Sequence, residues 1–233
     1  MREENLVKRL SRALRAPWNR MQAFGRLREY HSRSRSPEEA VEWALNFGSS
    51  GRFRVHTVQK RSEILSLARA VAELQPRVIL EIGTARGGTS LIWSTLASEL
   101  VLTCDLDHPP DRTPLLEAFP PPSSSCRTRL LTGDSHAADF RNRVVEALEG
   151  RQVDFLFIDG DHTEAGVGKD YDDYHELVRT GGLIAFHDIV EKQAIPTNVV
   201  HPFWERVKQG KDYQEFIDDP SQTGFGIGVL VVS

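Results

Sequence analysis

Apolar residues in the N-terminal part of the chain recur at helical spacing. Leu6, Leu10 and Leu14 fall at positions i, i+4 and i+8, which predicts one stripe along a helix. Pro17 should break or kink this helix, because proline lacks a backbone N–H and its ring clashes with the preceding turn. Further apolar residues up to Leu27 predict that helical structure continues beyond the proline.

A second helical signal follows a linker at residues 33–35. Ser36 is suited to be an N-cap, and Glu39 lies three residues later, where it completes a capping box. We therefore expect a helix over residues 37–46, and a further helix over residues 62–74.

The pattern changes after residue 76, where short continuous apolar runs alternate with helical segments. The runs have the length and composition of strands that are buried on both faces. Strands are expected at residues 77–83, 100–107, 127–135, 153–161, 183–188 and 225–233, and helices at residues 89–99, 137–148, 167–178 and 201–209. This alternation predicts an α/β domain with a largely parallel sheet.

Composition adds limits on size and location. The chain has 233 residues, of which 39% are hydrophobic and 27% charged, as in an ordinary globular protein with one large core. No apolar run approaches the ~20 residues of a membrane helix, so we expect no membrane span. The two cysteines, Cys104 and Cys126, make no disulfide framework, which favours a cytoplasmic location.

Charge is unevenly distributed along the chain. Residues 1–35 hold ten Lys and Arg but three acidic residues, so the net charge of −4 leaves −11 on the remainder. Such a basic arm is typical of a solvated helix that docks on an acidic body, and it is also compatible with contact to nucleic acid, anionic lipid or an acidic partner.

The segment EIGTARGG, residues 81–88, ends the first expected strand on a carboxylate and a glycine turn. Ligands of open α/β sheets bind at the carboxyl ends of strands, and glycines allow the backbone to approach a ligand closely. A dinucleotide site would read G-x-G-x-x-G, whereas the spacing here is G-x-x-x-G-G. Glu81 is unsuited to a pyrophosphate and favours a ligand with a positive centre or an amino group.

Acidic residues also end the next two expected strands. Asp105 lies about twenty residues beyond the glycine turn, where a carboxylate can accept hydrogen bonds from ribose hydroxyls, and Asp107 is a close substitute. Asp134 and Ser135 end the third strand, and either could instead act as an N-cap of the following helix.

A second group of polar residues ends the fourth and fifth expected strands. These residues are Asp159, Asp161, His162, His187 and Asp188. Burying several carboxylates side by side is costly unless a cation or a proton compensates their charge. The group therefore predicts a divalent cation site, although His162 could simply cap the next helix.

The glycine turn resembles motif I of the class I S-adenosylmethionine-dependent methyltransferases, whose pattern is E/D-x-G-x-x-x-G. The resemblance implies a Rossmann-like fold with a seven-stranded, mostly parallel sheet, helices on both faces and an additional N-terminal helical segment. It implies S-adenosylmethionine as cofactor, with ribose at Asp105 or Asp107 and adenine at Asp134 and Ser135. The other cofactor-binding residues that it implies are Glu81, Gly83, Thr84, Ala85, Gly87, Gly88, Ser90 and Asp159.

The stretch FIDGDHTEAGVGKDY, with GGLIAFHDI after it, resembles the branch that includes cephalosporin-hydroxylase-like and macrolide-sugar O-methyltransferases, a family-24 type related to the catechol enzymes. That resemblance implies Mg²⁺ or another divalent cation bound by Asp159, His187 and Asp188. His187 stands where some relatives carry Glu or Asp, and a His ligand favours a softer divalent ion than pure oxygen ligation does. Asp159 and His162 are the implied catalytic residues, with His162 as general base.

These inferences predict an O-methyltransferase acting on a small hydroxylated molecule, such as a sugar-bearing natural product or a catechol-like compound. Residues 61–233 would form the cofactor-binding domain, and residues 1–60 a helical cap or an arm that makes a homo-oligomer. Two alternatives remain at this point. One is a nucleic-acid methyltransferase that uses the basic arm, which lacks the interleaved aromatic residues of a single-strand binder. The other is a cofactor-binding module without catalysis.

Overall fold

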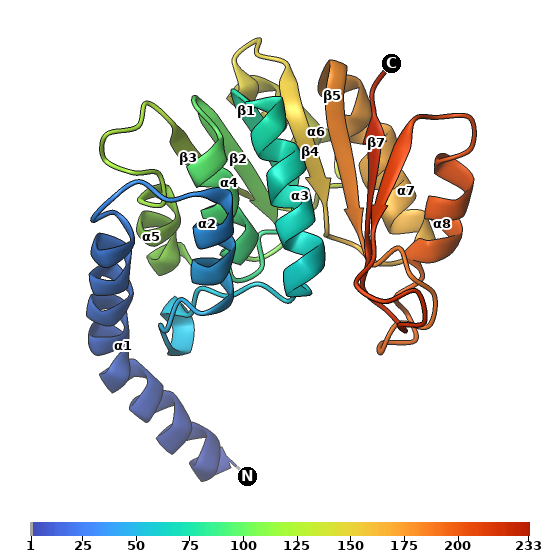
Figure 1. The fold of residues 1–233 in the computed structure, drawn as a ribbon. Coiled ribbons are helices and arrows are strands. Elements are labelled where there is room, and N and C mark those ends of the chain that lie inside the picture. The colour runs from blue at the N-terminus through green and yellow to red at the C-terminus, as the bar shows by residue number, and fades with distance from the viewer. Residues whose placement is uncertain (1) are drawn as a thin grey trace.

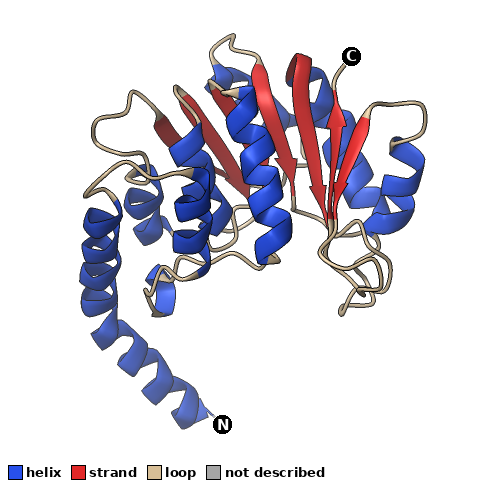
Figure 2. Cartoon of the chain, viewed as in Figure 1, coloured by secondary structure: helices blue, strands red, loops and turns tan. Residues whose placement is uncertain are grey.

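The structure, a computed structural model, describes residues 2–233, with side chains from residue 15 onward. Seven strands form one sheet, coloured red in Figure 2. They are β1 (Val78–Ile82), β2 (Leu100–Asp105), β3 (Arg127–Thr132), β4 (Val153–Ile158), β5 (Val178–His187), β6 (Tyr213–Phe216) and β7 (Ile227–Val231). Their order is β3-β2-β1-β4-β5-β7-β6, with β7 antiparallel to both β5 and β6 and the other pairs parallel.

Helices cover both faces of this sheet (Figure 1). They are α1 (Arg2–Tyr30), α2 (Pro37–Leu45), α3 (Arg61–Leu74), α4 (Gly88–Leu96), α5 (Thr113–Glu117), α6 (Ala138–Leu148), α7 (Glu164–Tyr174) and α8 (Val200–Val207), with short 3-10 turns η1 (Gly51–Phe53), η2 (Pro110–Arg112) and η3 (His175–Leu177). This arrangement confirms the predicted Rossmann-like class I methyltransferase fold with an N-terminal helix.

Strand alternation divides the core into two parts. Successive residues of a strand point to opposite faces, so Ile79 packs among α1 to α5 while its neighbour Leu80 packs among α6 to α8. Both side chains are fully buried. The strands are therefore apolar on both faces, which is why they appear as continuous apolar runs in the sequence.

Several element boundaries differ from the sequence prediction. Strand β6 was not predicted, because YQEF is short and polar and lies at the exposed edge of the sheet. Strand β5 begins at Val178 and not at residue 183, and its register with β4 shifts between Val153 and Phe155. Helix α7 begins at Glu164, ahead of the predicted residue 167, because Thr163 is its N-cap and accepts a hydrogen bond from Gly166 N at 3.0 Å.

The N-terminal helix agrees with the predicted pattern where it can be compared. Helix α1 contains Pro17, and Figure 1 shows that it bends along its length and that its first half extends away from the sheet. The Leu6, Leu10 and Leu14 stripe lies outside the described side chains. From Ala23 onward α1 joins the core that includes α3 and α4. The predicted boundary at residue 60 stays a prediction. Ser36 and Glu39 form the expected capping box.

Glu81 is a fully buried carboxylate that ties β1 to β2 and α4. Its oxygens accept hydrogen bonds from Trp93 Nε1 at 2.9 Å, from Thr103 Oγ1 at 2.6 Å and from Ser90 Oγ. Burial raises the pKa of Glu81 to about 7, even though these donors favour the ionised form. A buried strand can carry this carboxylate because three hydrogen-bond donors from neighbouring elements surround it.

The raised pKa of Glu81 gives a test by pH-dependent unfolding. Because the pKa is above its unfolded value, folding takes up a proton between about pH 4.5 and 7, and this group makes stability fall as pH rises through that window. The Glu81→Gln variant should lack this contribution, which is on the order of 3 kcal/mol. Urea unfolding of both proteins at about pH 5 and about pH 8 measures the difference. Parallel pH profiles for the two proteins would contradict the burial argument.

Candidate functional site

The turn after β1 lies against the end of β4. Gly83 has φ 105°, and a Cβ on this residue would lie 2.0 Å from the carbonyl oxygen of Asp159. Asp159 N donates to Ile82 O at 2.8 Å, so the two strand ends are hydrogen-bonded as well as closely packed. Only glycine fits here, and its presence places the first residue beyond β4 at the edge of the glycine turn.

A cavity of about 470 Å³ opens at this edge, along the carboxyl ends of β1 to β4. The predicted cofactor residues that line it are Gly83, Ala85, Asp105, Asp134, Ser135 and Asp159. His162, predicted as the general base, lines it as well, together with Leu106, Gly133, His136, Gly160 and Asp161. The structure therefore brings together most of the acidic and small residues that the sequence placed at strand ends.

Other predicted residues lie behind the turn. Glu81, Thr84 and Ser90 are buried and bonded to one another or to Thr103. A Cβ on Gly87 would lie 2.5 Å from Leu116 Cδ2, and one on Gly88 would lie 2.4 Å from the backbone of His56. The two glycines thus make room for protein atoms, and these five residues shape the turn from behind the wall of the cavity.

Asp105 is held against the glycine turn. Its Oδ2 accepts a hydrogen bond from Ala85 N at 2.6 Å, and its Oδ1 accepts one from Asp107 N at 3.3 Å. Ala85 has φ 43°, so the turn adopts a left-handed conformation at the residue that donates to Asp105. Asp107 is exposed and lies outside the cavity lining among the described residues, so Asp105 is the better placed of the two carboxylates.

The turn after β3 is organised by Asp170, a residue of α7 that the sequence analysis did not single out. Asp170 is fully buried; its Oδ1 accepts a hydrogen bond from Ser135 Oγ at 2.7 Å and lies 3.2 Å from His136 Nε2. Burial raises the pKa of Asp170 to about 6, although its neighbours Ser135 and His136 oppose this shift. Asp134 accepts from His136 N at 2.9 Å and does not cap α6.

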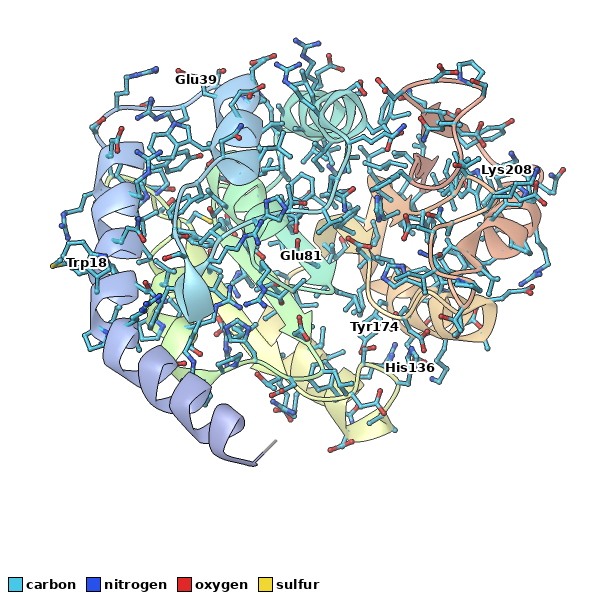
Figure 3. The ribbon with its side chains drawn as sticks, turned by 90° about the horizontal axis from the view of Figure 1, so that it is seen from below. Trp18, Glu39, Glu81, His136, Tyr174 and Lys208 are labelled. Carbon is cyan, nitrogen blue, oxygen red and sulfur yellow. The ribbon has the colours of Figure 1, made fainter. Side chains whose placement is uncertain are left out.

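Figure 3 looks onto the carboxyl ends of the strands and labels Glu81 near the middle of the view, with His136 and Tyr174 together nearer one side. Tyr174 donates to Ser135 O at 2.6 Å. Helix α7 thus fixes the β3–α6 turn through Asp170 and Tyr174. The sequence signal for Asp170 was a polar residue on the inward face of the predicted helix in VGKDYDDY. That signal is weak as long as the packing of the helix is not known.

Two carboxylates and two imidazoles meet at the ends of β4 and β5. His187 Nδ1 lies 3.1 Å from Asp159 Oδ1 and 3.3 Å from Asp188 Oδ1. His162 Nδ1 lies 3.0 Å from Asp188 Oδ2, and one donor atom each of Asp159, His162 and Asp188 lie within 4.8 Å of one another. The predicted metal ligands were Asp159, His187 and Asp188, whereas the three residues whose donor atoms lie within 4.8 Å of one another are Asp159, His162 and Asp188. Asp161, by contrast, accepts from Thr163 N and packs against Gly166.

The charges in this cluster compensate one another. Burial alone would lower the pKa of His187, but Asp159 and Asp188 raise it to about 10. Burial alone would raise the pKa of Asp188, but its hydrogen bonds with His162, His187 and Asn198 bring it below its ordinary value. The hydrogen bond with Asp188 likewise raises the pKa of His162. One buried imidazolium therefore balances part of the negative charge, and a divalent cation could take over this role.

Two amides that no motif indicated complete the cluster. Gln59 Nε2 donates to Asp159 Oδ2 at 2.9 Å, and Asn198 Nδ2 donates to Asp188 Oδ2 at 2.5 Å. Both residues lie in loops; Gln59 is 100 residues from Asp159 in the sequence, and Asn198 is ten residues beyond Asp188. The sequence offered no signal for them, because loop positions carry no periodicity that predicts contacts.

Among the described helices, none is both long enough and apolar enough to cross a membrane.

Residues 80–189 match the model of a family described as "Methyltransferase domain" (Methyltransf_24). No curated protein sequence gave a significant match.

Solved structures of similar fold include O-methyltransferases in complex with SAH or SAM. One from Bacillus cereus, in complex with SAH, is 19% identical with a TM-score of 0.58 over 82% of this chain and 90% of that chain. TomG from Streptomyces achromogenes, involved in tomaymycin synthesis and in complex with SAM, is 14% identical with a TM-score of 0.57 over 86% and 91%. MycE from the mycinamycin biosynthetic pathway, in complex with Mg and SAH, is 15% identical with a TM-score of 0.54, and the match covers 87% of this chain but 54% of MycE. At these identities the likeness shows the class I fold, and residues 80–189 of this fold match the family-24 methyltransferase domain.

Proposed function

We propose that the protein is an S-adenosylmethionine-dependent O-methyltransferase of small hydroxylated molecules. The observation that carries this proposal is the position of the carboxylate and imidazole cluster at one end of the cavity. Asp159 and His162 line that end, whereas Asp134, Ser135 and His136 line the other. A cofactor with its nucleoside at the β3 end would direct its sulfonium toward Asp159 and His162.

The residues along the cavity suit the parts of such a cofactor. Asp105 can accept hydrogen bonds from ribose hydroxyls, and Asp134 and Ser135 face the place of the adenine. Gly83 and Ala85 allow close approach at the middle of the cavity. We assign Glu81, Thr84, Gly87, Gly88 and Ser90 a supporting role, since their contacts are with the protein.

Methyl transfer to a hydroxyl joins the acceptor oxygen to the methyl carbon, breaks the bond from that carbon to sulfur and releases the hydroxyl proton. His162 is the group placed to take this proton, because it lines the cavity and 39% of its side chain is exposed, against 5% for His187. Thr163 caps α7, so His162 is not needed for that role. Asp188 orients the His162 ring from its buried side.

The residues at this end also fit a divalent cation. Two carboxylates and an imidazole offer oxygen and nitrogen donors within 4.8 Å of one another, a mixed set that suits Mg²⁺, Mn²⁺ or a softer divalent ion. We propose Asp159 and Asp188 as its ligands, with His162 or His187 beside them. Such an ion would lower the pKa of a hydroxyl bound to it. MycE, which was solved with Mg and SAH, supports this proposal by analogy of fold.

We further propose that α1 serves as an oligomerisation arm in a cytoplasmic enzyme. Trp18 and Met21 are 64% and 55% exposed, and Met21 lines a hollow of about 510 Å³. Residues Ala16, Pro17, Arg20, Met21, Phe24, Phe53 and Asp111 line this hollow. Exposed apolar side chains around a hollow are typical of a contact surface.

The cofactor assignment predicts measurable binding of S-adenosylhomocysteine. We expect a dissociation constant in the micromolar range, and Asp105→Ala should weaken binding by about 10- to 100-fold through loss of hydrogen bonds to a charged acceptor. Asp107→Ala is the matched control, since that carboxylate is exposed and outside the cavity lining. Isothermal titration calorimetry of the three proteins decides the matter. Equal affinities would refute the ribose assignment, and tight binding of NAD instead would refute the cofactor.

The assignment of the general base predicts a selective loss of turnover. His162→Ala should lower kcat by about 10²- to 10⁴-fold. His175→Ala, outside the cluster, serves as control. Turnover is measured on a panel of catechols and hydroxylated sugars, with Mn²⁺ affinity measured in parallel. If His162 is the general base, its replacement leaves Mn²⁺ affinity unchanged; if His162 is a metal ligand, its replacement weakens Mn²⁺ binding. Wild-type kcat in the variant would exclude both.

The arm predicts a change of molecular mass. Trp18→Asp combined with Met21→Asp should yield a smaller particle in light scattering, because charged side chains are costly to bury in an interface. Val145→Asp on α6, also an exposed apolar position, is the control. An unchanged mass would show that this surface does not mediate self-association.

A further inference from the structure

Three buried polar atoms around the Asp159 and Asp188 carboxylates have no hydrogen-bond partner among the described residues. They are Gln59 Oε1, Asn198 Oδ1 and His187 Nε2. Unpaired polar atoms at such depth cost free energy, so their concentration at one place indicates a ligand that would satisfy them. Two of the three belong to amides whose other atom already binds a carboxylate.

Gln59 reaches the cluster from the N-terminal part of the chain, in the loop between η1 and α3. Only 9% of the residue is exposed. Its Nε2 donates to Asp159 Oδ2, which leaves Asp159 Oδ1 on the side of His187 and His162. The loop itself is anchored nearby, because Gly88 N donates to His56 O at 3.2 Å.

Asn198 reaches the cluster from the C-terminal part of the chain, in the loop between β5 and α8. Its Nδ2 donates to Asp188 Oδ2 and lies 3.4 Å from His162 Nδ1. The next residue, Val199, donates its N–H to His162 O at 2.8 Å, so this loop is fixed to the residue that lines the cavity. Each carboxylate thus has one amide donor, and the two amides come from two separate loops, one before β1 and one after β5.

The choice of amides has an electrostatic consequence. A Lys or Arg at these positions would neutralise the carboxylates permanently and would repel a cation. In the part of the chain whose side chains are described, neither Asp159 nor Asp188 is paired with Lys or Arg; their charged partners are His162 and His187. Neutral N–H donors fix the orientation of a carboxylate without themselves cancelling any of its charge.

We propose that Gln59 and Asn198 are positioning residues of a divalent-cation site, and that they orient Asp159 and Asp188 for the ion through their amide N–H groups. This inference rests on the proposed function, in which that site lies at the methyl-transfer end of the cavity. It also gives the loop before α3 a place in the site, since Gln59 belongs to residues 1–60 and Asp159 to the methyltransferase domain.

The test is Mn²⁺ binding, which requires no knowledge of the acceptor. Titration calorimetry and electron paramagnetic resonance of the SAH-loaded protein measure Mn²⁺ affinity for the wild type, Gln59→Met and Asn198→Leu. We expect each variant to raise the Mn²⁺ dissociation constant by about 10- to 100-fold, the usual effect of losing a hydrogen bond to a metal ligand. Gln222→Leu is the matched control: its amide bonds Glu63 and Gly224, outside the cluster, and the affinity should stay at the wild-type value.

Thermal unfolding separates positioning from damage to the fold. If Gln59→Met lowers the unfolding midpoint more than Gln222→Leu does, Gln59→Asn is used as the test variant in its place. The shorter Asn side chain keeps an amide but moves it away from Asp159, so the same loss of Mn²⁺ affinity is expected. Wild-type Mn²⁺ affinity in folded Gln59 and Asn198 variants would overturn the inference, as would a wild-type protein that binds SAH but no Mn²⁺. If the wild-type protein does not bind SAH, Mn²⁺ is titrated in the absence of SAH. A weaker Mn²⁺ affinity of both variants would then support the cation site, while the missing SAH binding would overturn the proposed function.

Discussion

The close approach of the glycine turn to the end of β4 is the contact on which the site depends. At Gly83 a side chain would collide with the Asp159 carbonyl oxygen, and Asp159 N is bonded to the last residue of β1. Because these two strands are neighbours at the centre of a parallel sheet, their carboxyl ends meet at one edge. The glycine turn and the Asp159 carboxylate at the β4 end of the cavity are thereby fixed relative to one another.

The buried carboxylates near this edge of the sheet have two different environments. Glu81 is surrounded by hydroxyl and indole donors, and burial raises its pKa toward neutrality. Asp159 and Asp188 are instead surrounded by imidazoles and amides, and the pKa of His187 is raised between them. The first environment holds strands and helix together. The second leaves negative charge at the edge of the cavity, where a cation can use it.

The N-terminal region contributes more to this site than an appended cap would. From Ala23 onward it shares the core of α3 and α4, and the backbone at His56 packs so tightly on Gly88 that no side chain fits there. Gln59 then reaches Asp159 from the same segment. The glycine turn is consequently held from two sides, by the sheet beneath it and by the segment that leads into α3.

The sequence by itself determined the fold class, because apolar runs of strand length alternating with helical stripes can be buried only in an α/β arrangement. It also determined which residues stand at strand ends, and hence that Asp105, Asp134, Asp159 and Asp188 lie at one edge. Tertiary structure alone decided which of them face the cavity, that Glu81, Gly87 and Gly88 face the protein, and that Asp170, Gln59 and Asn198 take part. The physical reason is that periodicity reports burial along an element, whereas contacts between loops and helices distant in sequence depend on packing that no local pattern records.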